Sequence, residues 1–114
     1  MKRVAEVDID WDGTFKYVLI RAQDRDSDAE KTLVRGYADC EYHADIFERV
    51  EQQHVSSLRL TCLGGGRIRL DRSKLEIQVY GYSLGFGRAD HSVTASILRR
   101  SYPKFDVVWS NEGY

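Results

Sequence analysis

The sequence predicts an α+β fold: a mixed β-sheet of about six strands with helices packed on its faces. Short segments of alternating or β-branched apolar residues recur along the chain and are separated by turn residues, which is typical of strands. Two other segments place apolar residues every three or four positions, as amphipathic helices do. The 114 residues match the commonest size of one domain. We therefore expect residues 1–114 to form a single domain, whose strand order the sequence does not give.

In the first third of the chain the pattern predicts three strands, at residues 4–9, 15–20 and 32–37. Asp12-Gly13 is a strong turn signal between the first two strands. Residues 22–31 are polar, contain four acidic side chains and have no apolar period. We expect them to form an exposed loop and the most mobile segment.

The first predicted helix covers residues 43–55, with His43 at or just before its first turn. Its apolar positions are Ala44, Phe47, Val50 and Ile46, which should face inward. Strands are predicted at residues 58–63 and 67–70, with the glycines of residues 64–66 interrupting them, and at residues 75–82 after a turn at 71–73. The middle of the chain should therefore be a helix followed by three strands.

The second predicted helix covers residues 91–100, and either Asp90 or Ser92 can cap it. Val93, Ile97 and Leu98 should face inward, and Pro103 closes the helix. A last strand is expected at residues 105–109.

Charge and cysteine content exclude several protein classes. Seventeen Lys and Arg balance eighteen Asp and Glu, whereas nucleic-acid binding needs a basic surface. No apolar run is long enough to span a bilayer, so we expect no membrane partner. Cys40 and Cys62 lack the spacing of a disulfide framework or a metal site, which suits a reducing compartment. These features predict a cytoplasmic protein without a nucleic-acid or membrane partner.

Three places have residues suited to binding an anion: the helix start at His43, the glycines before Arg67, and the loop of residues 83–87 that leads to His91. Helix starts and glycine loops present free N–H groups to oxyanions, and phosphate suits them best. Each signal has a structural alternative. A glycine triplet between strands is more often a bulge or hairpin loop, and Lys16 in an apolar strand is ordinarily an exposed lysine.

Elimination favours histidine for any acid–base chemistry. A helix would place His43 and His54 about 16 Å apart, too far to share a metal ion, so a zinc site is not expected. His54 fits a solvated or capping position. Cys40 and Ser83 lack the sequence patterns of nucleophilic phosphatases and hydrolases. Histidine is then the best acid or base near neutral pH.

Six motifs, in order along nearly the whole chain, resemble the phosphohistidine phosphatase family, also called the Janus or Ocnus family. They are Gly13-Thr14-Phe15-Lys16-Tyr17-Val18, Val34-Arg35-Gly36-Tyr37, Glu41-Tyr42-His43-Ala44-Asp45-Ile46, Gly64-Gly65-Gly66-Arg67-Ile68, Val79-Tyr80-Gly81-Tyr82-Ser83 and Glu112-Gly113-Tyr114. The resemblance implies a monomeric, cytoplasmic α+β protein that removes phosphate from histidine-phosphorylated proteins and uses no metal or other cofactor.

The resemblance also implies residue roles. His43, in the motif Tyr-His-Ala-Asp, corresponds to the catalytic histidine, and Ala44 beside it belongs to the binding site. Lys16 corresponds to the substrate-contacting lysine and Arg67 to the phosphate-facing arginine. We expect neutral His43 to act as a general base on water, with direct attack on phosphorus as its alternative role.

The binding loop implied by the resemblance is Ser83, Leu84 and Gly85. Leu84 and Gly85 depart from the Met-Ala pair of better-known members, which affects pocket shape more than backbone contacts. Whether His91 lines the pocket or only caps and packs its helix stays open, as does activity on phospholysine. A phosphoprotein-binding module that has lost turnover is the competing functional hypothesis.

Overall fold

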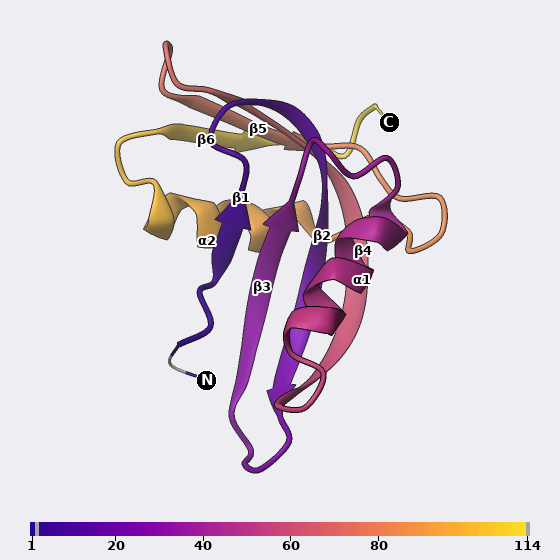
Figure 1. The fold of residues 1–114 in the computed structure, drawn as a ribbon. Helices are drawn as coiled ribbons and strands as arrows, with labels where there is room; N and C mark the ends of the chain where they lie inside the picture. The colour runs from indigo at the N-terminus through magenta and orange to yellow at the C-terminus, as the bar shows by residue number, and fades with distance from the viewer. Residues whose placement is uncertain (2, 114) are drawn as a thin grey trace.

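A computed structural model gives the fold and describes residues 1 and 3–113. Six strands form one mixed sheet in the order β1–β3–β2–β4–β5–β6, and two helices pack against it (Figure 1). The inner pairs are antiparallel, whereas β1 and β6 each pair in parallel with their neighbour. The predicted α+β class is therefore confirmed. The elements are β1 (Val7–Ile9), β2 (Gly13–Asp24), β3 (Glu30–Gly36), α1 (His43–Gln53), β4 (Leu58–Asp71), β5 (Glu76–Tyr80), α2 (His91–Ser101) and β6 (Asp106–Trp109).

The central pair β2 and β4 is longer than the sequence pattern predicts. The expected exposed loop at residues 22–31 is confined to residues 25–29, because β2 continues to Asp24 and β3 begins at Glu30. Ala22 is buried in the core, and Gln23 donates a hydrogen bond of 2.9 Å to the Glu30 carboxylate across the two strands. Backbone pairing and these side-chain contacts extend the hairpin through a segment that looks polar in sequence.

The glycine triplet lies inside β4 and does not separate two strands, which corrects the predicted interruption. The β2–β4 register shifts where Leu19 pairs with Gly64 and Ile20 with Cys62, so Leu63 is the extra residue. Gly64 has a φ of 144°, in the region that favours glycine. A bulge at the start of the triplet, one of the structural alternatives for this motif, is thus what the chain forms.

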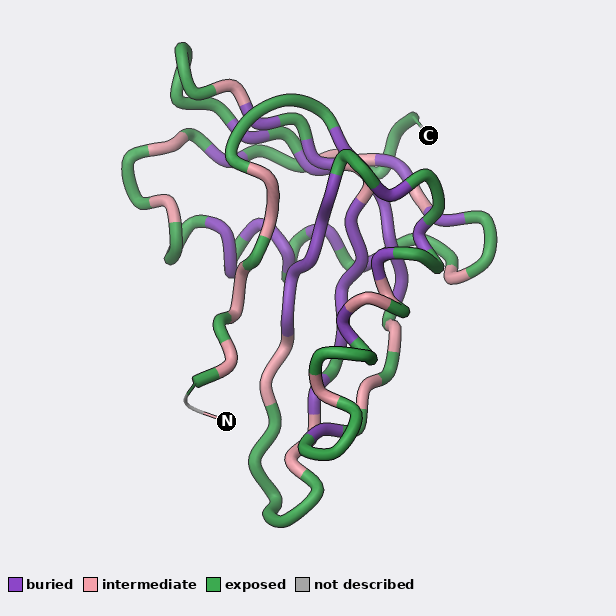
Figure 2. The backbone as a smooth tube through the Cα atoms, viewed as in Figure 1, coloured by how far each residue is buried: buried purple, intermediate pink, exposed green. Residues whose placement is uncertain are grey.

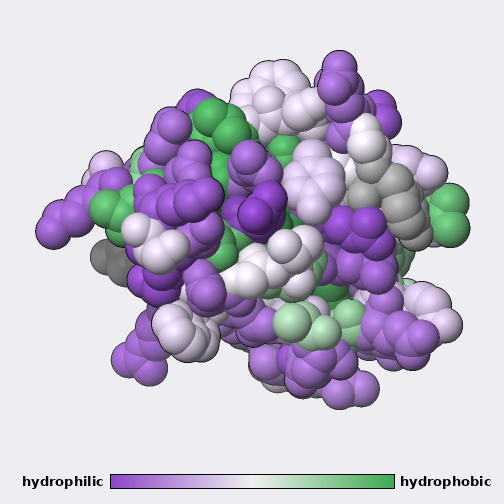
Figure 3. All heavy atoms as spheres, turned by 90° about the horizontal axis from the view of Figure 1, so that it is seen from above, coloured by the Kyte–Doolittle hydropathy of each residue, from purple (hydrophilic) through white to green (hydrophobic). Residues whose placement is uncertain are grey.

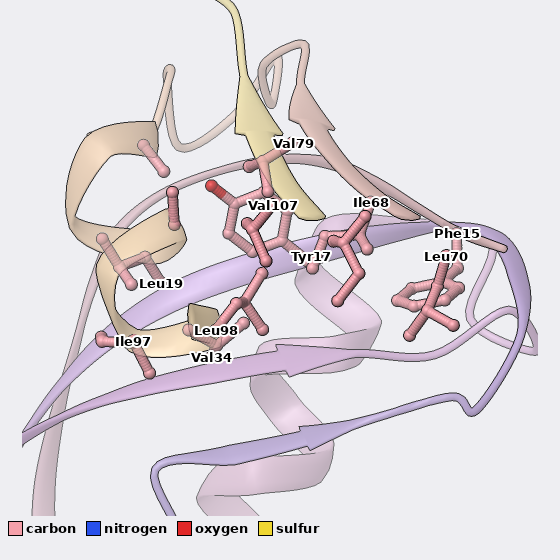
Figure 4. Packing of buried hydrophobic residues seen from close by; sticks show 13 residues of the cluster. Phe15, Tyr17, Leu19, Val34, Ile68, Leu70, Val79, Ile97, Leu98 and Val107 are labelled. Atoms are coloured by element: carbon pink, nitrogen blue, oxygen red, sulfur yellow. The ribbon is translucent and has the colours of Figure 1, made fainter. Parts of the chain in front are cut away.

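The two helices cover opposite faces of the sheet. Alternate residues of β2 separate into two cores: Tyr17 and Leu19 pack on the α2 side, and Val18 and Ile20 on the α1 side. Figure 4 shows the first core, where Leu19 lies near Ile97 and Leu98 of α2, and Tyr17 lies near Val79 and Val107. Buried backbone concentrates in the middle of β2 and β4 (Figure 2). The two central strands therefore carry side chains for both faces.

Both helices begin where the sequence predicts. Asp45 accepts a hydrogen bond of 3.0 Å from the Tyr42 N–H at the start of α1, and Asp90 accepts one of 3.1 Å from the Ser92 N–H at the start of α2. Two inward assignments are wrong: Ala44 and Val93 are exposed, because the first turns of the helices face the protein with other residues, His43 and Ile46 in α1 and His91 and Thr94 in α2. Within the described residues, neither helix is long and apolar enough to cross a membrane.

Candidate active site

A cavity of about 530 Å³ lies between the start of α1 and the loop after β5. It is lined by Lys16, Glu41, Tyr42, His43, Ala44, Ser83, Leu84, Gly85 and Phe86. Six of the seven residues predicted for the site therefore border one hollow, although they come from three separate parts of the chain. The seventh, Arg67, lies beside Lys16 in the sheet.

His43 is only 8% exposed, and its imidazole is fixed by one hydrogen bond. Its Nε2 lies 2.9 Å from the Gly66 carbonyl oxygen. Since a carbonyl oxygen can only accept, Nε2 carries the proton of the neutral ring and Nδ1 keeps its lone pair. Among the described residues no group bonds to Nδ1, and no buried side-chain nitrogen or oxygen lacks a partner, so Nδ1 is open to the cavity. This is the arrangement that a base or a nucleophile requires.

Glycine at position 65 is what lets the imidazole approach β4 closely. A Cβ built at Gly65 would lie 2.7 Å from His43 Cδ2, 2.8 Å from the Tyr17 carbonyl oxygen and 3.1 Å from Ser83 Cβ. No side chain fits at those distances. The glycine therefore brings the start of α1 and the loop after β5 together on one face of the sheet.

Two cations lie on the same face as α1. Lys16 of β2 and Arg67 of β4 are cross-strand partners, so their side chains project to the same side. Lys16 alternates with Tyr17 and therefore faces the α1 side, where it lines the cavity. Both cations act on His43 through their fields. The structural alternative of an ordinary exposed lysine does not hold for Lys16, which is half-buried.

The pKa of His43 is lowered from its ordinary value. Burial contributes most, because it disfavours the charged ring, and Lys16 and Arg67 lower the pKa further. The hydrogen bond to Gly66 opposes these effects only in part. His43 is therefore neutral at pH 7, with an unprotonated nitrogen facing the cavity.

Beyond the end of β5, the loop that follows it takes its place as the hydrogen-bonded neighbour of β4. The N–H of Gly65 donates to the Gly87 carbonyl oxygen at 3.0 Å, and the N–H of Ala89 donates to the Gly65 carbonyl oxygen at 3.0 Å. Phe86 packs edge-on against Phe47 of α1, with ring centroids 5.7 Å apart. The loop is thus attached both to the sheet and to the helix that carries His43.

Ser83 differs from its expected role in one respect. It is 2% exposed, and its N–H already donates to the Gly87 carbonyl oxygen at 3.1 Å, so this amide is not available to a phosphoryl group. The Ser83 hydroxyl accepts a hydrogen bond of 3.1 Å from the Phe86 N–H and keeps its own proton. Leu84 and Gly85 are exposed at the cavity and can offer amides, as can Ala44 in the first turn of α1.

Comparison with known proteins agrees with the motifs. The family model of the Janus/Ocnus family matches residues 1–106. The chain belongs to the Janus/Ocnus family. A 14 kDa phosphohistidine phosphatase of Sus scrofa is 42% identical over 120 residues, covering 100% of this chain and 95% of the relative. The sex-regulated protein janus-A of Drosophila melanogaster is 50% identical over 109 residues, covering 95% of this chain and 80% of the relative.

His91, the histidine at the start of α2, does not line the cavity of this Janus/Ocnus protein. His91 Nε2 donates to the Gly81 carbonyl oxygen at 2.8 Å, so its Nδ1 accepts from the Tyr17 hydroxyl at 2.6 Å. Thr94 lies 3.0 Å from the same hydroxyl and completes the buried network. These contacts are on the α2 side of the sheet, where a Cβ at Gly66 would meet the His91 ring at 2.6 Å. His91 therefore packs and positions α2.

Three cavity residues of this family member are absent from the sequence-based set: Glu41, Tyr42 and Phe86. Glu41 and Tyr42 directly precede His43, so their place in the motif was an available signal, whereas nothing in the sequence places Phe86 near α1. His54 caps the end of α1. In the described part of the chain, no three His, Cys, Asp or Glu side chains are grouped closely enough to hold a metal.

Proposed function

We propose that this protein is a phosphohistidine phosphatase that needs no metal, with histidine-phosphorylated proteins as substrates. One observation carries the proposal: His43 presents an unprotonated Nδ1 to a cavity that also holds Lys16 and free amides. Phosphoryl transfer depends mainly on positioning and charge stabilisation, which such a site supplies. The name of the porcine relative supports phosphohistidine as the substrate.

The phosphoryl oxygens would be bound by Lys16, Arg67, the Ser83 hydroxyl and the amides of Leu84, Gly85 and Ala44. This cradle combines cations with neutral donors aimed at a tetrahedral oxyanion. Binding there neutralises the charge that repels an attacking water. It also aligns phosphorus with His43.

In the proposed reaction His43 Nδ1 takes a proton from a water molecule placed in line with the phosphorus–nitrogen bond. The water oxygen forms a bond to phosphorus as that bond breaks, the leaving imidazole nitrogen takes up a proton from solvent, and protonated His43 then returns its proton to solvent. Inorganic phosphate and free histidine side chain result. In the rival role Nδ1 itself bonds to phosphorus as the bond to the substrate histidine breaks, and the leaving imidazole nitrogen takes up a proton from solvent. Water then attacks the phosphoryl group on His43 and releases inorganic phosphate and neutral His43.

Location and assembly are part of the proposal. Cys40 and Cys62 are free thiols, which suits the reducing cytoplasm, and we propose a monomer acting there.

The experiment mixes the purified protein with a histidine-phosphorylated protein, with and without a chelator, and measures phosphate release. The proposal expects release that the chelator does not change. Binding without release would support the competing hypothesis, a phosphoprotein-binding module that has lost turnover. Release abolished by the chelator would indicate a metal enzyme. Mapping a trapped phosphoryl group would separate attack by His43 from general-base catalysis.

A further inference from the structure

A bare part of the sheet adjoins the cavity on the same face. Helix α1 packs on β2, β3 and β4, and its core includes Leu58 near the start of β4. The other end of β4 pairs with β5, which pairs with β6. Arg69, Gln78 and Val108 are all exposed on the α1 side of the sheet. No described helix therefore covers this end of β4 or the neighbouring parts of β5 and β6.

The strand register orders this bare face into rows of cross-strand partners, whose side chains share one face. The site row is Lys16, Arg67 and Tyr80. The middle row is Thr14, Arg69, Gln78 and Val108. The acidic row is Asp71, Glu76 and Asp106.

The three rows lie at increasing, regularly spaced distances from the cavity. Successive rows are two residues apart along β4, and strands rise about 3.3 Å per residue, so the acidic row lies roughly 13 Å from the site row. An extended peptide covers that distance in about four residues. The face is therefore the right length for a short segment on one side of a phosphorylated residue.

The surface over these rows is hollowed. Gln78 lines two adjoining hollows: one of about 120 Å³ with Arg69 and Glu76, and one of about 460 Å³ with Tyr80 and Val108. Figure 3, which looks down on the end of the molecule with the β4–β5 hairpin, shows mostly hydrophilic side chains with small apolar areas between them. A Gln side chain with a donor and an acceptor, next to Val and Tyr, suits peptide backbone and mixed side chains.

The two ends of the bare face carry charges of opposite sign. The site row carries two cations, which suit the phosphoryl group, and the acidic row carries three carboxylates. Glu76 and Asp106 are exposed and form no ion pair with any described residue. Lys74 borders the smaller hollow but is likewise outside ion-pair distance of them. The far end therefore complements a basic side chain.

We propose that the bare face binds the substrate polypeptide beside the phosphohistidine in an extended form, and that Glu76 and Asp106 select a basic residue about four positions away. This inference rests on the proposed phosphatase function, which places the phosphohistidine of the substrate at the site row. It adds a substrate preference that the cavity alone does not supply.

The test measures the affinity of two peptides that differ only in one residue, Lys or Glu, four positions from a stable phosphonate analogue of phosphohistidine. Each peptide is made in two versions, with that residue either N-terminal or C-terminal to the analogue. Binding is followed by fluorescence anisotropy at low ionic strength, where surface charges are least screened. The wild-type protein should prefer Lys about 3- to 10-fold on one side, given what exposed ion pairs contribute. The double variant E76K/D106K should reverse the preference, and E76Q/D106N should abolish it.

The matched control is D26K/D28K, which makes the same charge change in the β2–β3 connection at the other end of the sheet (Figure 1). It should keep the wild-type preference. Equal affinity of wild-type protein for the two peptides, or an equal effect of both double variants, would overturn the docking surface. Turnover of phosphoramidate by the wild-type protein is measured separately. Its absence alongside a clear peptide preference would overturn the phosphatase proposal and leave the docking surface intact.

Discussion

The Nε2 atom of His43 lies 2.9 Å from the carbonyl oxygen of Gly66, on the strand that also carries Arg67. This one contact sets the tautomer, because the carbonyl oxygen requires a proton on Nε2 and so leaves Nδ1 unprotonated. It also fixes the ring against a strand that is rigidly paired in the sheet.

Replacing His43 should remove activity without unfolding the protein. We expect His43→Ala to lose about 10²- to 10⁴-fold in kcat, because the base or nucleophile is gone. His43→Gln is the matched variant, since its amide can still donate to Gly66 but has no basic nitrogen. Phosphate release and circular dichroism would check both. An active His43→Gln enzyme would contradict the assignment.

Removing a cation should change both rate and pH dependence. Lys16 stabilises phosphoryl charge in the proposal, and loss of one such group costs about 10²–10³ in kcat. Lys16 also lowers the His43 pKa, so Lys16→Gln should raise that pKa and move the acid limb of the pH–rate profile to higher pH. NMR titration of the His43 ring measures the shift directly. A limb that moves to lower pH would refute the electrostatic account.

Gly65→Ala should disrupt the site. The added methyl would lie 2.7 Å from His43 Cδ2 and 2.8 Å from the Tyr17 carbonyl oxygen, and the backbone atom cannot move aside cheaply. We expect a loss of about 1–3 kcal/mol in unfolding free energy, measured with urea, together with loss of activity. Gly85→Ala is the control, because a Cβ there meets nothing within 4 Å. It should unfold like the wild-type protein.

Tyr17→Phe should separate stability from catalysis. The change leaves His91 Nδ1 and the Thr94 hydroxyl without their shared partner, which we expect to cost about 1–3 kcal/mol. The hydroxyl lies on the α2 side of the sheet, away from the cavity, so kcat should change little. Tyr102→Phe, whose hydroxyl bonds to no described side chain, provides the comparison in the same urea unfolding assay. Equal stability of the two variants would contradict the network.

Acidification should destabilise the fold through its histidines. His43, His54 and His91 all have pKa values lowered mainly by burial. The unfolded chain then binds more protons than the folded one just below the ordinary imidazole pKa of about 6.5, so unfolding free energy falls as pH drops through that region. Urea unfolding between pH 7.5 and 5.5 checks this, and His43→Gln should show a weaker dependence. Stability that rises on acidification would contradict the pKa directions.

Local signals in the sequence predicted the elements that depend on a few neighbouring residues. Asp90 and the apolar spacing after it predicted α2, and the apolar spacing after His43 predicted α1. Capping and helical periodicity act within about one or two turns, so they are visible in the sequence. The inward assignment of Val93 failed because tertiary packing decides which side of the helix faces the sheet, and it buries His91, Thr94 and Ala95 instead.

Contacts between distant segments decided what the sequence left open. The polar ends of β2 and β3 became strand because they pair with each other, which residue type alone does not show. The glycine triplet permitted either a hairpin loop or a bulge, and the register with β2 selected the bulge. The same glycines make room for the two histidines: a Cβ at Gly65 would clash with the His43 ring on one face, and a Cβ at Gly66 would clash with the His91 ring on the other.

The sequence by itself determined the fold class, the family and six of the nine residues that line the cavity, because motifs and hydropathy periods are written in consecutive positions. Tertiary structure alone decided which nitrogen of His43 is free, that the Ser83 amide is already bonded, and that His91 belongs to the opposite core. The physical reason is the same for each: a proton or a side-chain direction is fixed by a partner far along the chain, and only the pairing of β2, β4 and the two helices brings that partner near.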